Sequence, residues 1–247
     1  SDFVPTDCTV FPLGTGSHAS LPPARTVDEL LEAAGALGCQ VIGLHAHVGS
    51  GILRSDAWTK TADLLSTLAR RVPGLQWIDV GGGLGVVERP GQTELNLDEV
   101  EAALSVFRTR LGEVQLRMEP GRYLVSEAGV LLNPVTQVRL KGEVRFVGVA
   151  TGMNSLLRPA LYGAWHGIHN LTRLDAAGTS YQHVVGPICE TGDILGRDRL
   201  LPETEPGDVL LLENAGAYGR VMSSSYNLRT PADEVVLRGS SSSDPGP

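Results

Sequence analysis

Three segments of the chain repeat apolar residues at every third or fourth position, and a short apolar run follows each of them. The helical spacing predicts helices, and the apolar runs predict strands. The predicted elements are a helix at 26–37, a strand at 40–47, a helix at 55–71, a strand at 75–80, a helix at 98–111 and a strand at 114–118. Three successive helix-then-strand units predict an α/β fold with a parallel sheet and helical crossovers.

Polar residues mark the starts of these predicted helices. Thr26 with Glu29, and Asp98 with Glu101, have the spacing of a capping box. Ser55 can cap the middle helix through its hydroxyl. We therefore expect each helix to begin at one of these positions.

The pattern changes at Gly129, where β-type segments replace the helix-then-strand units. The predicted elements here are a hairpin around 141–143, a helix at 159–169, and strands at 184–188, 209–212 and 235–237. The expected domains are an α/β barrel-type domain over 1–128 and a β domain over 129–238. We expect the Ser/Gly/Pro-rich residues 239–247 to form a disordered tail.

The 247 residues are 42% hydrophobic and 19% charged, which is typical of a globular protein with a buried core. The sequence has no apolar stretch near 18 residues and no signal-peptide pattern at its start, so we expect neither membrane insertion nor secretion. The net charge of −8, without a basic cluster, argues against a nucleic-acid partner. Three scattered cysteines fit no disulfide framework or zinc site and favour a reducing compartment, which we expect to be the cytoplasm.

Polar and glycine-rich residues follow each of the three predicted parallel strands. The segments are 45–50 (His-Ala-His-Val-Gly-Ser), 79–83 (Asp-Val-Gly-Gly-Gly) and 119–122 (Glu-Pro-Gly-Arg). Sites in parallel α/β folds, and above all in (β/α)8 barrels, are built at the carboxyl ends of the strands. The three segments therefore predict one shared site.

The glycine run favours a phosphate ligand. Gly81, Gly82 and Gly83 have no side chains, so their N–H groups can form an anion-binding nest, although a lone glycine run also suits a flexible loop. Ser50 can add a hydroxyl to the same phosphate. Arg122 can supply charge to a phosphate or to a substrate carboxylate.

His47 and Glu119 are the candidate chemical groups at the strand ends. His47 can act as a general base, bind a metal, stack on an aromatic cofactor or be structural. No carboxylate–histidine cluster with metal spacing surrounds His47 in the sequence, so we expect no metal. Glu119 inside a barrel mouth needs a cationic partner such as a protonated pyridine nitrogen; otherwise it is a solvated or capping carboxylate.

The second half of the chain places a thiol beside a carboxylate. Cys189 and Glu190 follow an apolar run, although a free cysteine in such a position is commonly inert. Other polar side chains that can reach a ligand lie in loops or near a predicted helix start: Arg158, Tyr162, Tyr218 and Tyr226.

Six ordered motifs between residues 41 and 237 resemble those of the alanine-racemase-like (fold type III) pyridoxal-phosphate-dependent decarboxylases, most closely the diaminopimelate decarboxylases. The motifs lie at 43–50, 79–85, 119–130, 152–162, 186–193 and 215–227. The resemblance implies the later strands of a (β/α)8 TIM barrel followed by a C-terminal β domain. Residues 150–154 also resemble the decarboxylase half of fused aspartate kinase–decarboxylase proteins.

The resemblance implies that the cofactor is pyridoxal 5'-phosphate (PLP). The implied cofactor-binding residues are His47, Ser50, Gly81, Gly82, Gly83, Glu119, Gly121, Arg122 and Tyr226. The implied substrate-binding residues are Arg122, Arg158, Tyr162, Glu190 and Tyr218. Of these, His47 would stack on the pyridine ring and Glu119 would keep the ring nitrogen protonated. Cys189 would donate a proton, and Cys189 with Glu190 would reach the active site of the other subunit of a homodimer.

The Schiff-base lysine of the family has no counterpart in these motifs. The chain has only two lysines, Lys60 in a predicted helix and Lys141 in the predicted hairpin, and neither can replace it. Where the family has a Ser-Lys-Phe-Gly-like element, residues 17–21 read Ser-His-Ala-Ser-Leu. Three units cannot close an eight-stranded barrel. We therefore expect this chain to be part of a longer protein whose earlier strands carry the lysine.

The function implied by the resemblance is that of a lyase that decarboxylates meso-diaminopimelate to L-lysine, with substrate identity resting on Cys-Glu-Thr-Gly-Asp at 189–193. The alternatives are a decarboxylase of another basic amino acid, a non-catalytic homologue that binds a partner subunit, and a phosphate-binding barrel isomerase without a cofactor. The isomerase is disfavoured because it leaves Cys189, Glu190 and the tyrosine loops unexplained.

Overall fold

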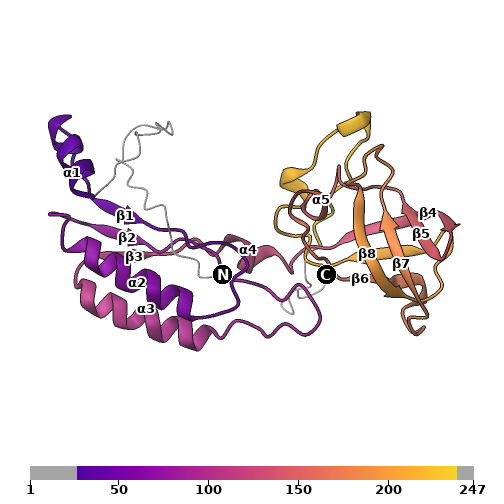
Figure 1. Cartoon of the computed structure of the whole chain (residues 1–247), viewed down its shortest axis with the longest axis horizontal. Coiled ribbons are helices and arrows are strands. Elements are labelled where there is room, and N and C mark those ends of the chain that lie inside the picture. The colour runs from indigo at the N-terminus through magenta and orange to yellow at the C-terminus, as the bar shows by residue number, and fades with distance from the viewer. Residues whose placement is uncertain (1–26, 238–247) are drawn as a thin grey trace, which may run out of the picture. The chain divides into compact units, whose positions relative to one another are not determined.

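The computed structural model describes residues 27–237, and these divide into two compact units between residues 125 and 126 (Figure 1). The predicted cap residue Thr26, the segment 17–21 and the predicted tail 239–247 lie outside the described residues. Between residues 27 and 237, no helix combines the length and the apolar character needed to cross a membrane.

The first unit alternates helices with short strands. Its elements are α1 (Val27–Ala36), β1 (Gly43–His45), α2 (Asp56–Ala69), β2 (Trp77–Asp79), α3 (Leu97–Leu111), β3 (Gln115–Arg117) and α4 (Gly121–Val125). The three strands form a parallel sheet in the order β1-β2-β3, with Leu44 opposite Ile78 and Ile78 opposite Leu116. Figure 1 shows α2 and α3 side by side along this sheet. The predicted parallel α/β arrangement is confirmed.

Large apolar side chains of α2 and α3 form the core of the first unit. Trp58 and Leu65 on α2 are completely buried, and Phe107 on α3 is 1% exposed. They belong to one cluster with Leu44 of β1 and Ile78 of β2. Each such side chain contributes about 1.5–3 kcal/mol by leaving water, so this cluster holds the strand ends of the first unit in a fixed arrangement.

The helix starts differ from the predicted caps. Asn96 caps α3, since its Oδ1 accepts the N–H groups of Asp98 at 3.0 Å and Glu99 at 3.2 Å. The predicted capping box of Asp98 and Glu101 is therefore wrong, because α3 begins one residue before Asp98 and places Glu99 opposite the cap. Ser55 precedes α2 but makes no cap hydrogen bond; its hydroxyl donates to Glu99 instead.

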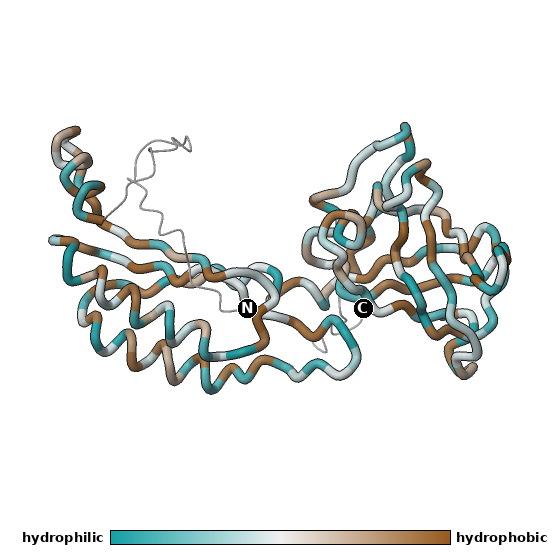
Figure 2. Tube along the Cα trace, viewed as in Figure 1, coloured by the Kyte–Doolittle hydropathy of each residue, from teal (hydrophilic) through white to brown (hydrophobic). Residues whose placement is uncertain are grey.

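The second unit is a curled sheet with short helices. Its elements are β4 (Leu131–Lys141), β5 (Val144–Val149), α5 (Arg158–Tyr162), β6 (Ile168–Asn170), η1 (Leu171–Arg173), β7 (Ser180–Val185), β8 (Ile194–Leu201), β9 (Val209–Leu212), η2 (Arg220–Met222) and η3 (Tyr226–Leu228). The strand order is β6-β9-β4-β5-β7-β8, and only β5 and β7 pair in parallel. The two edge strands contact each other, and a Cβ on Gly196 of β8 would lie 2.7 Å from Ile168 of β6. Figure 2 shows apolar residues along the strands of this sheet.

Local signals account for the correct and incorrect predictions in this unit. The hairpin is confirmed, with Gly142 at φ 63° between β4 and β5. The helix predicted at 159–169 is wrong beyond Tyr162, because Gly163 takes φ 63° and ends α5. No strand forms at 235–237, where the apolar side chains are 77–89% exposed. The sequence prediction missed β8, whose charged residues at 197–199 interrupt its apolar pattern.

Candidate active site

Titratable residues gather where the three parallel strands end. β1 ends at His45, β2 ends at Asp79, and Glu119 lies two residues after β3. His45 Nε2 and Glu119 Oε2 are 3.1 Å apart, and the ligand atoms of all three residues lie within 4.8 Å of one another. We call these three residues the strand-end cluster. Two carboxylates around one imidazole attract a cation, which can be a protonated ring nitrogen or a metal ion.

The sequence prediction selected Glu119 but missed His45 and Asp79. The missed signal is positional, because His45 and Asp79 are the last residues of neighbouring parallel strands and lie opposite each other in register. The sequence predicts no carboxylate–histidine cluster around His47 and so points away from a metal. The cluster forms around His45 instead, 74 residues away from its partner Glu119 along the chain.

The glycine run lies against His47 and Glu119. The side chain of His47 is exposed, and its Nδ1 accepts the N–H of Gly82 at 3.3 Å. The N–H of Gly81 donates to Asp79 Oδ1 at 2.8 Å. The predicted nest is therefore partly closed: of the three glycine N–H groups, only that of Gly83 has no hydrogen-bond partner among residues 27–237. Glycine is required at 82 because a Cβ there would clash with the carbonyl oxygen of Glu119.

Ser50 and Arg122 lie together, as a shared phosphate site requires. Arg122 donates through Nη2 to Ser50 Oγ and through Nη1 to Glu88 Oε1 at 3.0 Å. The side chain of Arg122 is only 16% exposed, so Glu88, which the sequence prediction missed, orients a half-buried cation. Gly121 turns the chain into α4 by donating its N–H to the carbonyl of Glu119 at 2.8 Å. Ser50 and Arg122 thus form a pair that can accept an anion, and Arg122 follows Glu119 of the strand-end cluster by three residues.

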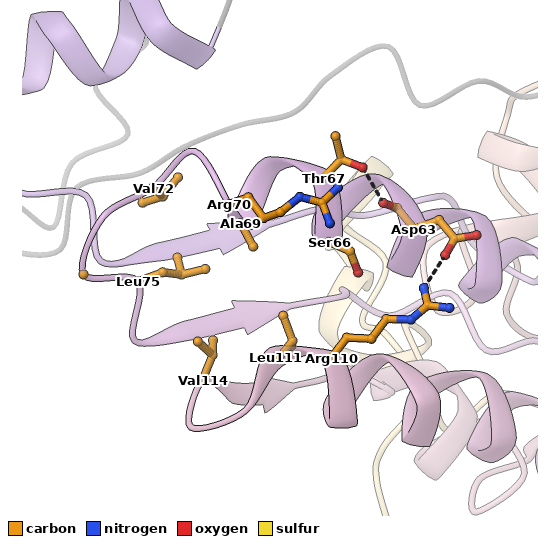
Figure 3. A pocket seen from close by; sticks show the side chains of 11 residues that line it. Asp63, Ser66, Thr67, Ala69, Arg70, Val72, Leu75, Arg110, Leu111 and Val114 are labelled. Carbon is orange, nitrogen blue, oxygen red and sulfur yellow. Dashed lines mark hydrogen bonds and ion pairs between the residues drawn. The ribbon is translucent and has the colours of Figure 1, made fainter.

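A hollow of about 660 Å³ lies at the opposite end of the same sheet (Figure 3). Its lining includes residues that precede β2 and β3, such as Leu75 and Val114, and an ion pair between Asp63 and Arg110 at 2.9 Å. None of the predicted site residues lines it. Because sites in parallel α/β folds lie at the carboxyl ends of the strands, we place the chemistry at the strand-end cluster.

The second unit joins three of the predicted residues. Cys189 is an exposed free thiol, and the adjacent carboxylate of Glu190 accepts the hydroxyl proton of Tyr226. The hydrogen bond to Glu190, followed by the negative charge of Glu190, holds the pKa of Tyr226 above its ordinary value, because both oppose formation of the phenolate. A thiol, a carboxylate and a phenol therefore lie at one exposed place.

The remaining predicted residues of the second unit differ in exposure. Arg158 is 3% exposed, with Nη1 3.2 Å from His166 Nε2, whereas Tyr162 at the other end of α5 is 66% exposed. Tyr218 is 48% exposed and has φ 61°, a conformation that non-glycine residues adopt at a cost. Tyr162 and Tyr218 are therefore accessible to a ligand, and Arg158 is held inside the unit.

Two models of one protein family match this chain in succession. The model described as pyridoxal-dependent decarboxylase, pyridoxal binding domain, matches residues 19–126, and the C-terminal sheet domain of the same family matches residues 122–216. The chain belongs to the pyridoxal-dependent decarboxylases. The predicted family resemblance is confirmed.

Known members of the pyridoxal-dependent decarboxylase family match most of this chain. The diaminopimelate decarboxylase of Methanothermobacter thermautotrophicus is 39% identical over 225 residues, which cover 87% of this chain and 52% of that protein. The diaminopimelate decarboxylase of Pseudomonas aeruginosa is 42% identical over 204 residues, which cover 81% and 48%. The crystal structure of diaminopimelate decarboxylase from Helicobacter pylori complexed with L-lysine matches with a TM-score of 0.69 and 35% identity, over 81% of this chain and 50% of that one. The predicted fold class is confirmed, and the chain spans about half the length of the relatives it matches.

The residues of the first unit fit the PLP of this decarboxylase family. The strand-end cluster attracts a cation, as a protonated pyridine nitrogen requires, and Ser50 with Arg122 can accept a phosphate. Lys60 lies on α2 in an ion pair with Asp56 at 3.2 Å, and Lys141 ends β4. Neither lysine lies at a carboxyl end of the parallel strands, which agrees with the prediction that neither replaces the family's Schiff-base lysine.

Proposed function

We propose that this protein decarboxylates meso-diaminopimelate to L-lysine with PLP as cofactor. The observation that carries the proposal is the pairing, within one unit, of the cation-attracting strand-end cluster with the anion-accepting Ser50 and Arg122. PLP carries both a pyridine nitrogen, which is cationic when protonated, and an anionic phosphate group. The identity of 39% and 42% to two diaminopimelate decarboxylases supports this substrate.

The first unit would hold and orient the cofactor. Glu119 would keep a proton at the ring nitrogen, and His47, whose Nδ1 is fixed by the Gly82 N–H, would offer its flat face to the ring. Ser50, Arg122 and the N–H of Gly83 would bind the phosphate, while Gly81 and Gly82 keep the backbone beside it free of side chains and Gly121 shapes the adjacent turn. When bound, PLP supplies the sink for the electron pair that the departing carboxylate leaves behind.

The second unit would bind the substrate and move a proton. Tyr162 and Tyr218 would bind substrate carboxylates, and so would Arg122 of the first unit; Arg158, predicted for the same role, is buried against His166 and would act from behind this surface. Glu190 would accept the distal ammonium group. Cys189 would hold at Sγ the proton that returns to the substrate α-carbon. Tyr226, which donates to Glu190, would lie against the cofactor.

We also propose a homodimer in which Cys189 and Glu190 serve the active site of the other subunit. Shared sites would explain why an exposed thiol and carboxylate are presented side by side at the surface of the second unit.

We place the protein in the cytoplasm, because exposed free thiols such as Cys39 and Cys189 persist in a reducing compartment.

The direct test measures CO2 release from meso-diaminopimelate by the purified protein in a form that includes the family's Schiff-base lysine, with and without added PLP. We expect PLP-dependent release from this substrate, and at least about tenfold less from L-lysine or L-ornithine at equal concentration. Intact mass and a visible absorption band that borohydride abolishes report whether the cofactor is covalently held. Equal rates with L-ornithine would point instead to the alternative of another basic-amino-acid decarboxylase, and no release with a bound cofactor would point to a non-catalytic homologue.

A substitution at Glu190 tests the substrate assignment. Glu190→Gln keeps the shape of the side chain but removes the charge that would pair with the distal ammonium. We expect kcat/KM for meso-diaminopimelate to fall by about 10- to 100-fold, or about 1.4–2.8 kcal/mol, because a charge-assisted hydrogen bond is lost. Unchanged substrate preference in this variant would remove Glu190 from the recognition site.

A further inference from the structure

A buried carboxylate in the second unit links two loops that carry predicted site residues. Asp193 is only 3% exposed. Its Oδ2 accepts the N–H of Ile188 at 2.7 Å, and its Oδ1 accepts the N–H of Met153 at 2.6 Å. One carboxylate therefore binds the loop between β7 and β8 and the loop between β5 and α5 at the same time.

Two glycines make room for this carboxylate. A Cβ on Gly152 or on Gly186 would clash with the carboxylate oxygens of Asp193, and a Cβ on Gly186 would also meet the α-carbon of Gly152. The two loops thus approach each other through bare backbone, with the Asp193 side chain between them. Neither glycine has the positive φ that would otherwise explain its presence.

The loop that carries Cys189 and Glu190 is hydrogen-bonded to the backbone of Asp193. The N–H of Gly186 donates to the carbonyl of Asp193 at 2.9 Å, and the N–H of Asp193 donates to the carbonyl of Glu190 at 3.2 Å. Together with the side-chain bond to Ile188, these bonds fix the backbone on both sides of the thiol. Cys189 and Glu190 are left as an exposed tip on a loop whose base is buried.

The facing loop is itself connected to the segment that carries Tyr226. The backbone carbonyl of Asn154 accepts the N–H of Ser224 at 2.9 Å, and the Oδ1 of Asn154 accepts the N–H of Gly152 at 3.1 Å. Tyr226, two residues after Ser224, returns to Glu190 through its hydroxyl. The contacts therefore form a ring in which the Asp193 carboxylate joins the loop between β7 and β8 to the loop between β5 and α5 through one backbone N–H group of each.

We infer that Asp193 is a positioning residue, whose buried carboxylate holds the tip formed by Cys189 and Glu190 against the Gly152–Asn154 loop. The role of that tip in proton transfer and substrate binding rests on the proposed function. The positioning of the loop by Asp193 does not depend on the proposed function, and it can be measured without turnover.

Asp193→Asn is the test variant, because asparagine keeps the size of the side chain but offers only one oxygen acceptor for two N–H groups. We expect hydrogen exchange at either the Ile188 or the Met153 amide to rise by about tenfold or more, because one of these two N–H groups loses its acceptor. Alkylation of Cys189 by iodoacetamide, measured relative to Cys39 in the same molecule, should change by about threefold or more as the tip moves. Asp175→Asn, at an exposed turn after η1, is the matched control and should alter neither quantity.

Turnover gives a second, separable result. With meso-diaminopimelate, we expect kcat of Asp193→Asn to fall by about 10- to 100-fold with PLP affinity unchanged, since misplacement of a reacting group mainly lowers kcat. Unchanged exchange at Ile188 and Met153 together with unchanged relative alkylation of Cys189 would overturn the inference. If both change while the wild-type protein shows no decarboxylation, the positioning role stands and the proposed function fails.

The wild-type protein provides a measurement that does not depend on how the variant folds. The amide of Ile188 should exchange about tenfold or more slowly than that of Thr191, whose N–H has no partner in the part of the chain that the structure describes. Equal exchange at the two amides would show that the Asp193 carboxylate does not hold the loop, and would overturn the inference as well.

Discussion

At the scale of single residues, Glu190 has two hydrogen-bond partners. In the structure it accepts a hydrogen bond from the hydroxyl of Tyr226, and under the proposed function it also accepts one from the ammonium group of a substrate. A carboxylate has enough lone pairs for both, so the phenol can orient the oxygen that the substrate meets. The same contact makes the ionisation of Tyr226 a reporter of the charge on Glu190.

We predict that Glu190→Gln lowers the pKa of Tyr226 toward its ordinary value. The hydrogen bond to the carboxylate and the carboxylate charge both raise this pKa in the wild-type protein, and the substitution removes the charge. Ultraviolet titration of tyrosinate absorbance measures the change, and Tyr226→Phe identifies the contribution of this phenol among the five tyrosines. An unchanged titration curve in Glu190→Gln would show that the two side chains are not in contact in solution.

At the scale of elements, α3 forms where the sequence predicts a helix, but its cap is Asn96 and not the predicted Asp98. We predict that Asn96→Ala lowers the free energy of unfolding by about 1 kcal/mol, because the side chain satisfies two N–H groups at the first turn. Glu101→Ala, at the position expected from the capping box, should change it by less than about 0.5 kcal/mol. Urea unfolding of the two variants measures both, and the reverse order of effects would restore the capping box of Asp98 and Glu101.

The junction of η1 and β9 makes the second unit sensitive to acid. Burial alone would raise the pKa of Asp208, but hydrogen bonds from Arg173, from Asn170 and from the N–H of Glu205 together lower it below the ordinary value of 3.8. A carboxyl group with a lowered pKa in the folded state stabilises the fold above its unfolded pKa. That stabilisation disappears as the pH falls below 3.8 and through the folded-state pKa.

We therefore predict that Asp208→Asn reduces the pH dependence of stability below pH 3.8. At neutral pH the variant should lose about 1–3 kcal/mol, because buried donors lose a charged acceptor. Glu205→Gln, at an exposed side chain that also meets Arg173, should lose less than about 1 kcal/mol. Urea unfolding from pH 2 to 7 measures both, and an equal acid dependence in wild type and Asp208→Asn would exclude Asp208 as its source.

At the scale of the whole molecule, the proposed shared sites predict complementation between two inactive variants. When Cys189→Ala and His47→Ala are co-expressed, random pairing makes about half of the dimers mixed, and each mixed dimer has one intact site. We expect about a quarter of wild-type CO2 release from the mixture, and almost none from either variant alone. Cys189→Ala mixed with Glu190→Ala should give no recovery, because each chain contributes both residues to its partner's site, so each of the two sites of a mixed dimer carries one of the changes. No recovery in the first mixture would place each site within one chain.

The family, the fold class and several members of the candidate site could be predicted from the sequence because they depend on short-range patterns. Helical periodicity located α2 and α3, and Gly142 marked the hairpin. Polar residues after apolar runs marked His47, the glycine run and Glu119. Cap positions and strand lengths were less well predicted, since Asn96 and Asp98 both suit a cap and only the observed start of α3 chooses between them.

The sequence by itself determined where chemistry is placed along the chain, because the periods of helix and strand and the backbone freedom of glycine are local properties. Only the tertiary structure decided which groups meet. His45 finds Glu119 through the parallel register of β1, β2 and β3, and Asp193 finds Met153 because two loops touch at glycines. The first contact joins residues that are 74 positions apart in the sequence, and the second joins residues that are 40 positions apart. Their formation depends on strand pairing and core packing, which act between segments that no local pattern connects.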